Sequence, residues 1–178
     1  QIKAKTVINE YGLITAVINT YAPALDCTVK LPQIEHNQHE ISTPDVIYQI
    51  VKDTPIELPA LLAMWLSLTE SEILGLTKSK SISSDGCYIT IKEVIVKDEH
   101  NNAVVKNKGK QPTRDRTLRL PEYLKQLIDK IETDQLVTLS GTALSKRFNR
   151  LITKAGIPHM TFHDLRHVNA SVMAVLRI

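Results

Sequence analysis

The amino-acid sequence predicts an α+β fold, in which a mostly helical domain carries one small antiparallel β-sheet. Apolar residues recur at helical spacing over most of the 178 residues, whereas β-rich segments with turn residues are confined to positions 87–120. The composition, 43% hydrophobic and 23% charged, is typical of a globular protein and too apolar for a disordered one. The chain has no apolar run of about 18 residues, so we expect no membrane span.

The first predicted helix covers residues 4–22 and is followed by the best candidate for a linker. Residues 22–42 contain two prolines, a polar run and no sustained periodicity, which indicates a connection between domains. We therefore expect residues 1–40 to belong to a different domain from residues 41–178. The apolar stripe of the first helix consists of Val7, Ile8, Tyr11, Ile14, Ile18 and Tyr21.

Three further helices are predicted at the start of the second domain. Ser42-Thr43-Pro44-Asp45 places a capping residue before a proline at the first helical position. The almost wholly apolar residues 60–68 indicate a buried helix. Thr69-Glu70-Ser71-Glu72 matches a capping box and predicts a short helix through Leu76. The core face of the first of these helices is expected to hold Val46, Ile47, Ile50 and Val51.

The central part of the chain predicts the small sheet. Its β-rich segments are residues 88–91, 94–96, 104–105 and 116–120. A polar, turn-like cluster at residues 98–102 separates the second segment from the third. The basic stretch 106–115, which contains a glycine and a proline, is interpreted as a hairpin loop, and the segment after it as the return strand.

The C-terminal part returns to helical periodicity. A helix is expected around residues 123–131, and another over 141–155 that ends at Gly156. The last helix is expected to begin at Thr161, because Thr161 and Asp164 have the spacing of a capping box. Its predicted apolar face consists of Leu165, Val168, Val172 and Leu176.

The net charge of +3 is unevenly distributed along the chain. Residues 1–105 carry 8 Lys and Arg against 13 Asp and Glu, whereas residues 106–178 carry 14 against 6. A basic half of this kind favours a polyanionic partner. The helix 141–155 concentrates basic residues opposite its apolar side, which suits contacts with DNA phosphates, although a solvated surface would show the same pattern. These residues are Lys146, Arg147, Arg150 and Lys154.

His163 and Arg166 form the best candidate for a reactive site. They lie three residues apart at the start of a predicted helix, where backbone N–H groups attract anions. Arginine offers a planar set of donors for phosphate oxygens, and histidine transfers protons near neutral pH. The spacing therefore indicates a phosphate site, although a histidine and an arginine three residues apart also occur by chance at the start of a surface helix.

The residues around this pair resemble the tyrosine recombinase, or phage integrase, family, most closely the integrases of prophages and mobile elements. The resemblance is carried by Phe162-His163-Asp164-Leu165-Arg166-His167, preceded by Ala155-Gly156-Ile157, and it covers nearly the whole chain. Supporting segments are residues 66–76, similar to the first arginine box, residues 116–121, similar to the strand after the catalytic-lysine hairpin, and the helix from Lys5-Thr6-Val7, similar to the last helix of the core-binding domain.

The resemblance implies DNA cleavage by a tyrosine that attacks a backbone phosphate and forms a 3′-phosphotyrosyl link, with no metal or cofactor. It assigns the second catalytic arginine to Arg166 and the preceding histidine to His163, while His167 is expected to be structural. For the catalytic lysine, counting back from the return strand favours Lys110, with Lys108 as second choice. Alternatively, Lys106, Lys108 and Lys110 contact only the DNA backbone. Arg114 is a further candidate for DNA binding.

Two departures from the family pattern are visible. Thr69 occupies the position expected for the first arginine, although Glu72 matches the acidic residue that accompanies it. The family's tyrosine lies beyond the helix of Arg166, but the last tyrosine here is Tyr123. The chain also begins without methionine. We therefore expect a piece of a longer recombinase, truncated before the nucleophile, that binds DNA without cleaving it.

The resemblance implies double-stranded DNA as partner, a homo-oligomer on DNA for the full-length protein, and no membrane. The chain has two cysteines, without CxxC spacing, which argues against a zinc ribbon and favours a reducing cytoplasm. Two alternatives remain open at this point. One is a catalytically degenerate, DNA-binding relative, and the other is a helical interaction module with no role in nucleic-acid binding.

Overall fold

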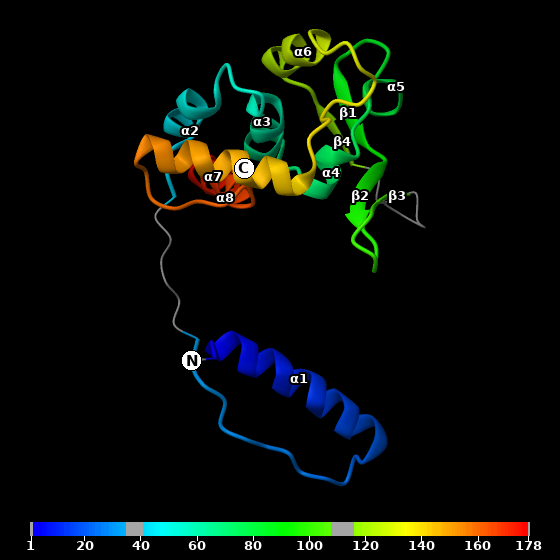
Figure 1. The fold of residues 1–178 in the computed structure, drawn as a ribbon, viewed down its shortest axis with the longest axis vertical. Coiled ribbons are helices and arrows are strands. Elements are labelled where there is room, and N and C mark those ends of the chain that lie inside the picture. The colour runs from blue at the N-terminus through cyan, green and yellow to red at the C-terminus, as the bar shows by residue number, and fades with distance from the viewer. Residues whose placement is uncertain (1, 35–40, 108–115, 178) are drawn as a thin grey trace. The chain divides into compact units, whose positions relative to one another are not determined.

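The computed structural model describes residues 2–34, 41–107 and 116–177 (Figure 1). The chain divides into two compact units, residues 1–39 and 40–178. The first unit contains helix α1 (Ala4–Tyr21), which agrees with the predicted helix. The Tyr11 hydroxyl donates a hydrogen bond to the carbonyl of Cys27 at 2.7 Å, and so ties the following segment back to the helix. Within α1 no side chain is buried.

The second unit is mostly helical and confirms the predicted α+β class. Its longest helix matches the sequence prediction at both ends, because Ser140 caps it and Gly156 adopts the left-handed conformation after it. The helices are α2 (Pro44–Val51), α3 (Glu57–Leu66), α4 (Glu70–Leu74), α5 (Lys78–Ser81), α6 (Glu122–Asp129), α7 (Gly141–Ala155) and α8 (Asp164–Leu176).

The strands are β1 (Tyr88–Ile91), β2 (Glu93–Lys97), β3 (Ala103–Asn107) and β4 (Arg116–Arg119). They form two antiparallel ladders of two strands each: β1 pairs with β4, and β2 pairs with β3. Only Lys92 separates β1 from β2, and both strands of the β2–β3 ladder lie in sequence between β1 and β4 (Figure 1). The return strand β4 therefore pairs with β1 and not with β3, which corrects the simple hairpin expected around residues 106–115.

The turn between β2 and β3 is stabilised by Asp98. Its carboxylate accepts hydrogen bonds from the backbone N–H groups of His100 at 2.9 Å and Asn102 at 2.7 Å. These bonds, chiefly the one from Asn102, lower the pKa of Asp98 because they favour the charged carboxylate. Asn101 adopts φ 69°, a conformation that asparagine tolerates in turns. The turn predicted at residues 98–102 is thus confirmed.

Helix α3 lies at the centre of the core. Eight of its residues, from Glu57 to Met64, are buried, and it packs against α2, α6 and α8. Two predicted core residues are instead exposed: Val46 on α2 is 43% exposed and Leu176 on α8 is 58% exposed. Both are near the ends of their helices, where the apolar stripe extends past the packed surface.

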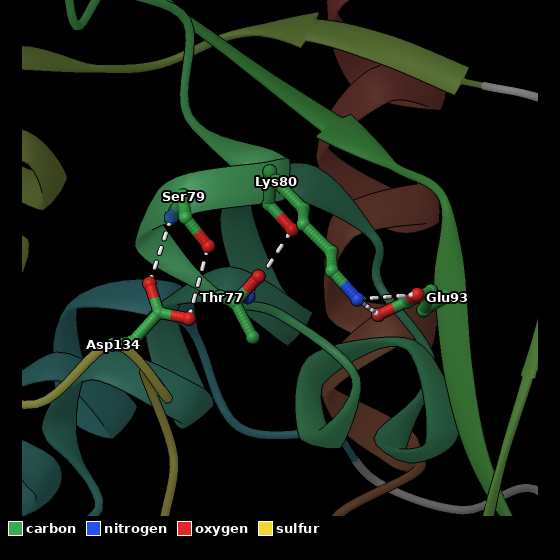
Figure 2. A network of polar contacts seen from close by, with 6 residues as sticks. Thr77, Ser79, Lys80, Glu93 and Asp134 are labelled. Carbon is green, nitrogen blue, oxygen red and sulfur yellow. Dashed lines mark hydrogen bonds and ion pairs between the residues drawn. The ribbon is translucent and has the colours of Figure 1, made fainter.

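The short helix α5 makes side-chain contacts with both β2 and the segment before α7 (Figure 2). The carboxylate of Asp134 accepts hydrogen bonds from the backbone and hydroxyl of Ser79, at 2.8 and 3.0 Å. Lys80 forms an ion pair with Glu93 on β2 at 2.8 Å. Thr77 donates its backbone N–H to the hydroxyl of Ser81 at 3.2 Å. These contacts attach α5 to the first residue of β2 on one side and to the segment before α7 on the other.

The capping box predicted from Thr69 to Glu72 is present. The Thr69 hydroxyl accepts a hydrogen bond from the backbone N–H of Glu72 at 3.3 Å, and the Glu72 carboxylate accepts one from the backbone N–H of Thr69 at 2.7 Å. The helix that follows ends at Leu74, two residues earlier than expected. Thr43 precedes α2 without making a side-chain capping bond.

The Thr69 cap makes a stability prediction. Thr69→Ala removes the acceptor at the start of α4, and we expect the free energy of unfolding to fall by about 1 kcal/mol. Urea unfolding followed by circular dichroism measures this change. Thr138→Ala, at an exposed threonine outside helices and strands, is the control and should leave the unfolding midpoint unchanged. Equal midpoints for both variants would show that the cap contributes nothing.

Candidate functional site

His163 and Arg166 lie together at the start of α8, as the sequence predicted. His163 is exposed and precedes the helix, and its carbonyl accepts a hydrogen bond from the backbone N–H of Arg166 at 3.1 Å. Arg166 is half-buried. The ring of His167 meets that of His163 edge to face, with ring centroids 5.6 Å apart. An exposed imidazole and a half-buried guanidinium therefore share this end of α8.

The start of α8 differs from the predicted one. The helix begins at Asp164 and not at Thr161. The Asp164 carboxylate accepts hydrogen bonds from the backbone N–H of Thr161 at 2.7 Å and from its hydroxyl at 2.8 Å. Because the Thr161 hydroxyl donates to this carboxylate, it does not act as the cap that the sequence suggested. The turn before the helix is fixed by Asp164.

Helix α8 is bound to the end of α3 through Asn169. The last carbonyls of a helix lack intrahelical donors and need partners from elsewhere. The Asn169 amide donates to the carbonyls of Met64 at 2.9 Å and Trp65 at 3.1 Å. Asn169 lies three residues after Arg166, on the same side of α8. The contact therefore fixes that side of α8 against the C-terminal end of α3.

Arg116, the first residue of β4, binds the next two carbonyls. Its Nη2 donates to the carbonyl of Leu66 at 3.5 Å and to that of Ser67 at 3.3 Å. The same nitrogen lies 3.8 Å from Oε2 of Glu72. Four consecutive carbonyls at the end of α3 thus receive hydrogen bonds from two side chains, Asn169 and Arg116, that are far apart in sequence.

Thr69 has no positive charge, but the guanidinium of Arg116 lies beside the capping box that Thr69 forms with Glu72. Thr69 uses its hydroxyl and its backbone N–H in the capping box with Glu72. The side chain of Glu72 is only 8% exposed, and the guanidinium next to it belongs to Arg116. The positive charge near this turn therefore comes from β4.

The four basic residues predicted on α7 lie on an exposed face. Lys146, Arg147, Arg150 and Lys154 are all exposed. The opposite face buries Leu144, Phe148 and Ile152. Ser145 donates a hydrogen bond to the carboxylate of Glu70 at 2.9 Å and so attaches α7 to α4. The helix thus presents a row of cations on one side while its apolar side packs into the core.

An open groove of about 1030 Å³ runs beside the first half of α7. Its walls come from α4, from the β2–β3 ladder and from the segment that leads into α7. Lys97 on β2 and Lys146 on α7 contribute cationic groups to its lining. The groove separates the basic face of α7 from the ladder.

The predicted lysine and one of the predicted DNA contacts cannot be placed. Lys110, its alternative Lys108, and Arg114 lie outside the described residues. The flanking strands end at Asn107 on one side and begin at Arg116 on the other.

Tyr123 is the last tyrosine of the sequence, and its hydroxyl is bound within the protein. It donates to Oε1 of Glu57 at 2.6 Å and lies 3.2 Å from the hydroxyl of Tyr48. The hydrogen bond to the Glu57 carboxylate raises the pKa of Tyr123 well above its ordinary value, because it favours the protonated phenol. This environment is the reverse of one that activates a nucleophile.

Neither a metal cluster nor a membrane helix is found in the described part of the chain. Residues 2–34, 41–107 and 116–177 bring no three His, Cys, Asp or Glu side chains together in a way that could hold a metal ion. Across the same ranges, no helix combines the length and apolar character that crossing a bilayer requires.

Sequence reasoning missed the roles of Arg116 and Asn169. In the sequence, Arg116 is visible only as part of a strand, and Asn169 belongs to no motif. A signal for Arg116 exists in the strand alternation, because Arg116 and Leu118 face inward while Thr117 and Arg119 are exposed. A charged residue at an inward position needs a partner, but its identity depends on tertiary contacts.

Comparison with known proteins supports the predicted fold. No family model matches the sequence, and no curated protein matches it. Among solved structures, the integrase of transposon Tn1549 in complex with circular intermediate DNA aligns with a TM-score of 0.80 at 16% identity, covering 98% of this chain and 68% of that chain. The same integrase in complex with transposon right end DNA gives a TM-score of 0.78.

More distant integrases and recombinases share the fold. The XerA recombinase aligns with a TM-score of 0.55 at 15% identity, covering 99% of this chain and 70% of that chain. The integrase of mycobacterium phage Brujita gives 0.56 at 13% identity, covering 98% and 60%. The fold expected from the family resemblance is therefore confirmed, and the low identities limit this conclusion to the fold.

The Asn169 contact generates a second stability prediction. Asn169→Leu leaves the carbonyls of Met64 and Trp65 without their donor, and we expect the free energy of unfolding to fall by about 1–3 kcal/mol. Asn149→Leu, at an exposed site on α7, is the matched control and should change stability by less than about 0.5 kcal/mol. Thermal unfolding measures the melting temperatures of both variants. Equal melting temperatures would contradict a role for Asn169 in holding α8.

Proposed function

We propose that the chain is a DNA-binding part of a site-specific recombinase, and that its parent protein integrates or recombines DNA by strand cleavage and rejoining. The observation that carries this proposal is the exposed basic face of α7, in the same unit as the His163 and Arg166 turn, within a fold shared with integrases solved on DNA. Of the three hypotheses from the sequence, the helical module without a nucleic-acid role explains none of these features.

Arg166 and His163 are proposed to act on the DNA backbone. A guanidinium at the start of a helix offers paired donors for two phosphate oxygens, and the positive end of the helix adds to the attraction. The exposed imidazole of His163 is accessible to an incoming phosphate, and histidine is a residue type that acts as general acid or base. The helix that carries Arg166 is bound to α3 one turn further on through Asn169, which favours a fixed position of its backbone.

The cations of α7 are proposed to bind phosphates without reading bases. Lys146, Arg147, Arg150 and Lys154 are exposed, and their long side chains suit the regular spacing of backbone charges. Lys97 on β2 provides a further cation, because it lines the same groove as Lys146. Affinity from such contacts is independent of sequence and falls with salt.

Further roles follow from the family resemblance. Lys110, with Lys108 as alternative, is proposed as the general acid, and Arg114 as a DNA contact. Residues 1–40 are proposed to be the last helix of a core-binding domain with its linker. The parent protein is proposed to act as a homo-oligomer on double-stranded DNA in the cytoplasm, without metal or cofactor.

The DNA-binding proposal is tested by fluorescence anisotropy of this chain on a labelled duplex at several salt concentrations. We expect salt-sensitive binding, and Arg150→Ala should reduce the slope of log K against log salt by about 0.9, which corresponds to one phosphate contact. Lys130→Ala, which removes one exposed charge beyond α6, is the control and should leave the slope unchanged. No binding at low salt would contradict the proposal.

We propose that the chain binds DNA without forming a covalent link. None of its five tyrosines follows Tyr123, whose hydroxyl is bound to Glu57. Incubation with a nicked duplex that traps phosphotyrosyl intermediates should give no slower band on a denaturing gel. A covalent adduct that disappears in Tyr123→Phe would overturn this proposal.

A further inference from the structure

The guanidinium of Arg116 is bound through one nitrogen and still has N–H donors without a partner in the described residues. Nη2 is held by the carbonyls of Leu66 and Ser67, where the negative end of α3 attracts a cation. Within the described part of the chain, Nη2 is the only nitrogen of this group with a hydrogen-bond partner, and Nε is buried without one. The side chain is nevertheless 38% exposed, so part of it faces solvent.

The position of Arg116 relates it to the start of α8. The two carbonyls that bind Arg116 directly follow the two that bind Asn169, so both side chains meet at one end of α3. Arg166 lies one helical turn before Asn169 on the same side of α8. Arg116 from β4 and Asn169 from α8 therefore bind the same end of α3, and Arg166 precedes Asn169 by one turn of α8.

The environment of Arg116 orients it and leaves its charge available. Glu72 lies 3.8 Å from Nη2, but its side chain is only 8% exposed, and its Oε2 also accepts the backbone N–H of Thr69. The carboxylate thus contacts the guanidinium from the buried side. An anion from solvent would meet the exposed part of Arg116 without displacing Glu72.

We propose that Arg116 binds a backbone phosphate of DNA, and so supplies the guanidinium that Thr69 cannot provide beside this turn. This inference rests on the proposed DNA-binding function and specifies one of its contacts. A guanidinium whose Nη2 is bound inside the protein still has free N–H donors, and such donors suit the oxygens of a phosphate. Arg116 then contacts the DNA backbone beside the turn that Thr69 caps.

The test compares Arg116→Met with Arg119→Met by anisotropy on the same duplex. Both changes remove one charge from β4, but Arg119 lies on the opposite, exposed face of the strand. We expect the slope of log K against log salt to fall by about 0.9 for Arg116→Met and to stay unchanged for Arg119→Met. Equal slopes, with a lower melting temperature for Arg116→Met, would show a purely structural clamp and overturn the inference.

Footprinting of the unmodified chain avoids dependence on the folding of the variant. Phenylglyoxal modifies exposed arginines, and mass spectrometry maps the products with and without duplex. We expect DNA to reduce modification of Arg116 and Arg150 several-fold while Arg119 reacts as before. Protection of Arg150 without Arg116 would overturn this inference and leave the proposed function standing. Absence of DNA binding would overturn both.

Discussion

The C-terminal end of α3 imposes the constraint on which the candidate site depends. A helix that ends inside a core leaves carbonyls that must find donors, and here the chain turns away through Ser67 in a left-handed conformation. The backbone N–H groups of Ser67 and Leu68 both return to the carbonyl of Leu62. The carbonyls from Met64 to Ser67 accept hydrogen bonds from side chains of other elements. Asn169 donates to the first two carbonyls, and Arg116 donates to the last two.

This requirement joins segments that are far apart in sequence. Asn169 belongs to the helix that begins with His163 and Arg166, Arg116 begins the strand after the segment that contains Lys110, and α3 leads directly into the Thr69 capping box. Satisfying one helix end therefore brings the start of β4, through Arg116, and helix α8, through Asn169, to a common point. The basic face of α7 needs no such device, because its apolar side fixes its orientation and Ser145 binds it to α4.

The features that could be predicted from the sequence are those that depend on residues close together in the chain. The bounds of α7 follow from its periodicity, Ser140 and Gly156, and the Thr69 capping box follows from a four-residue motif. Local patterns did not reveal that β4 pairs with β1, since strand pairing depends on long-range packing. They also missed Arg116 and Asn169, because a side chain that binds the end of a distant helix leaves no periodic signal. The predicted start of α8 at Thr161 was wrong, because the Thr161 hydroxyl donates a hydrogen bond to the Asp164 carboxylate and does not cap the helix.

The most direct test of this account is a double-mutant cycle between Arg116 and Asn169, measured as the free energy of unfolding. Both side chains bind neighbouring carbonyls at one helix end, so removal of either frays the same turn and makes removal of the other less costly. We predict a coupling free energy above about 0.5 kcal/mol between Arg116→Met and Asn169→Leu. Additive effects within about 0.3 kcal/mol would mean that α8 and β4 are held independently, and would contradict the central role of the α3 end.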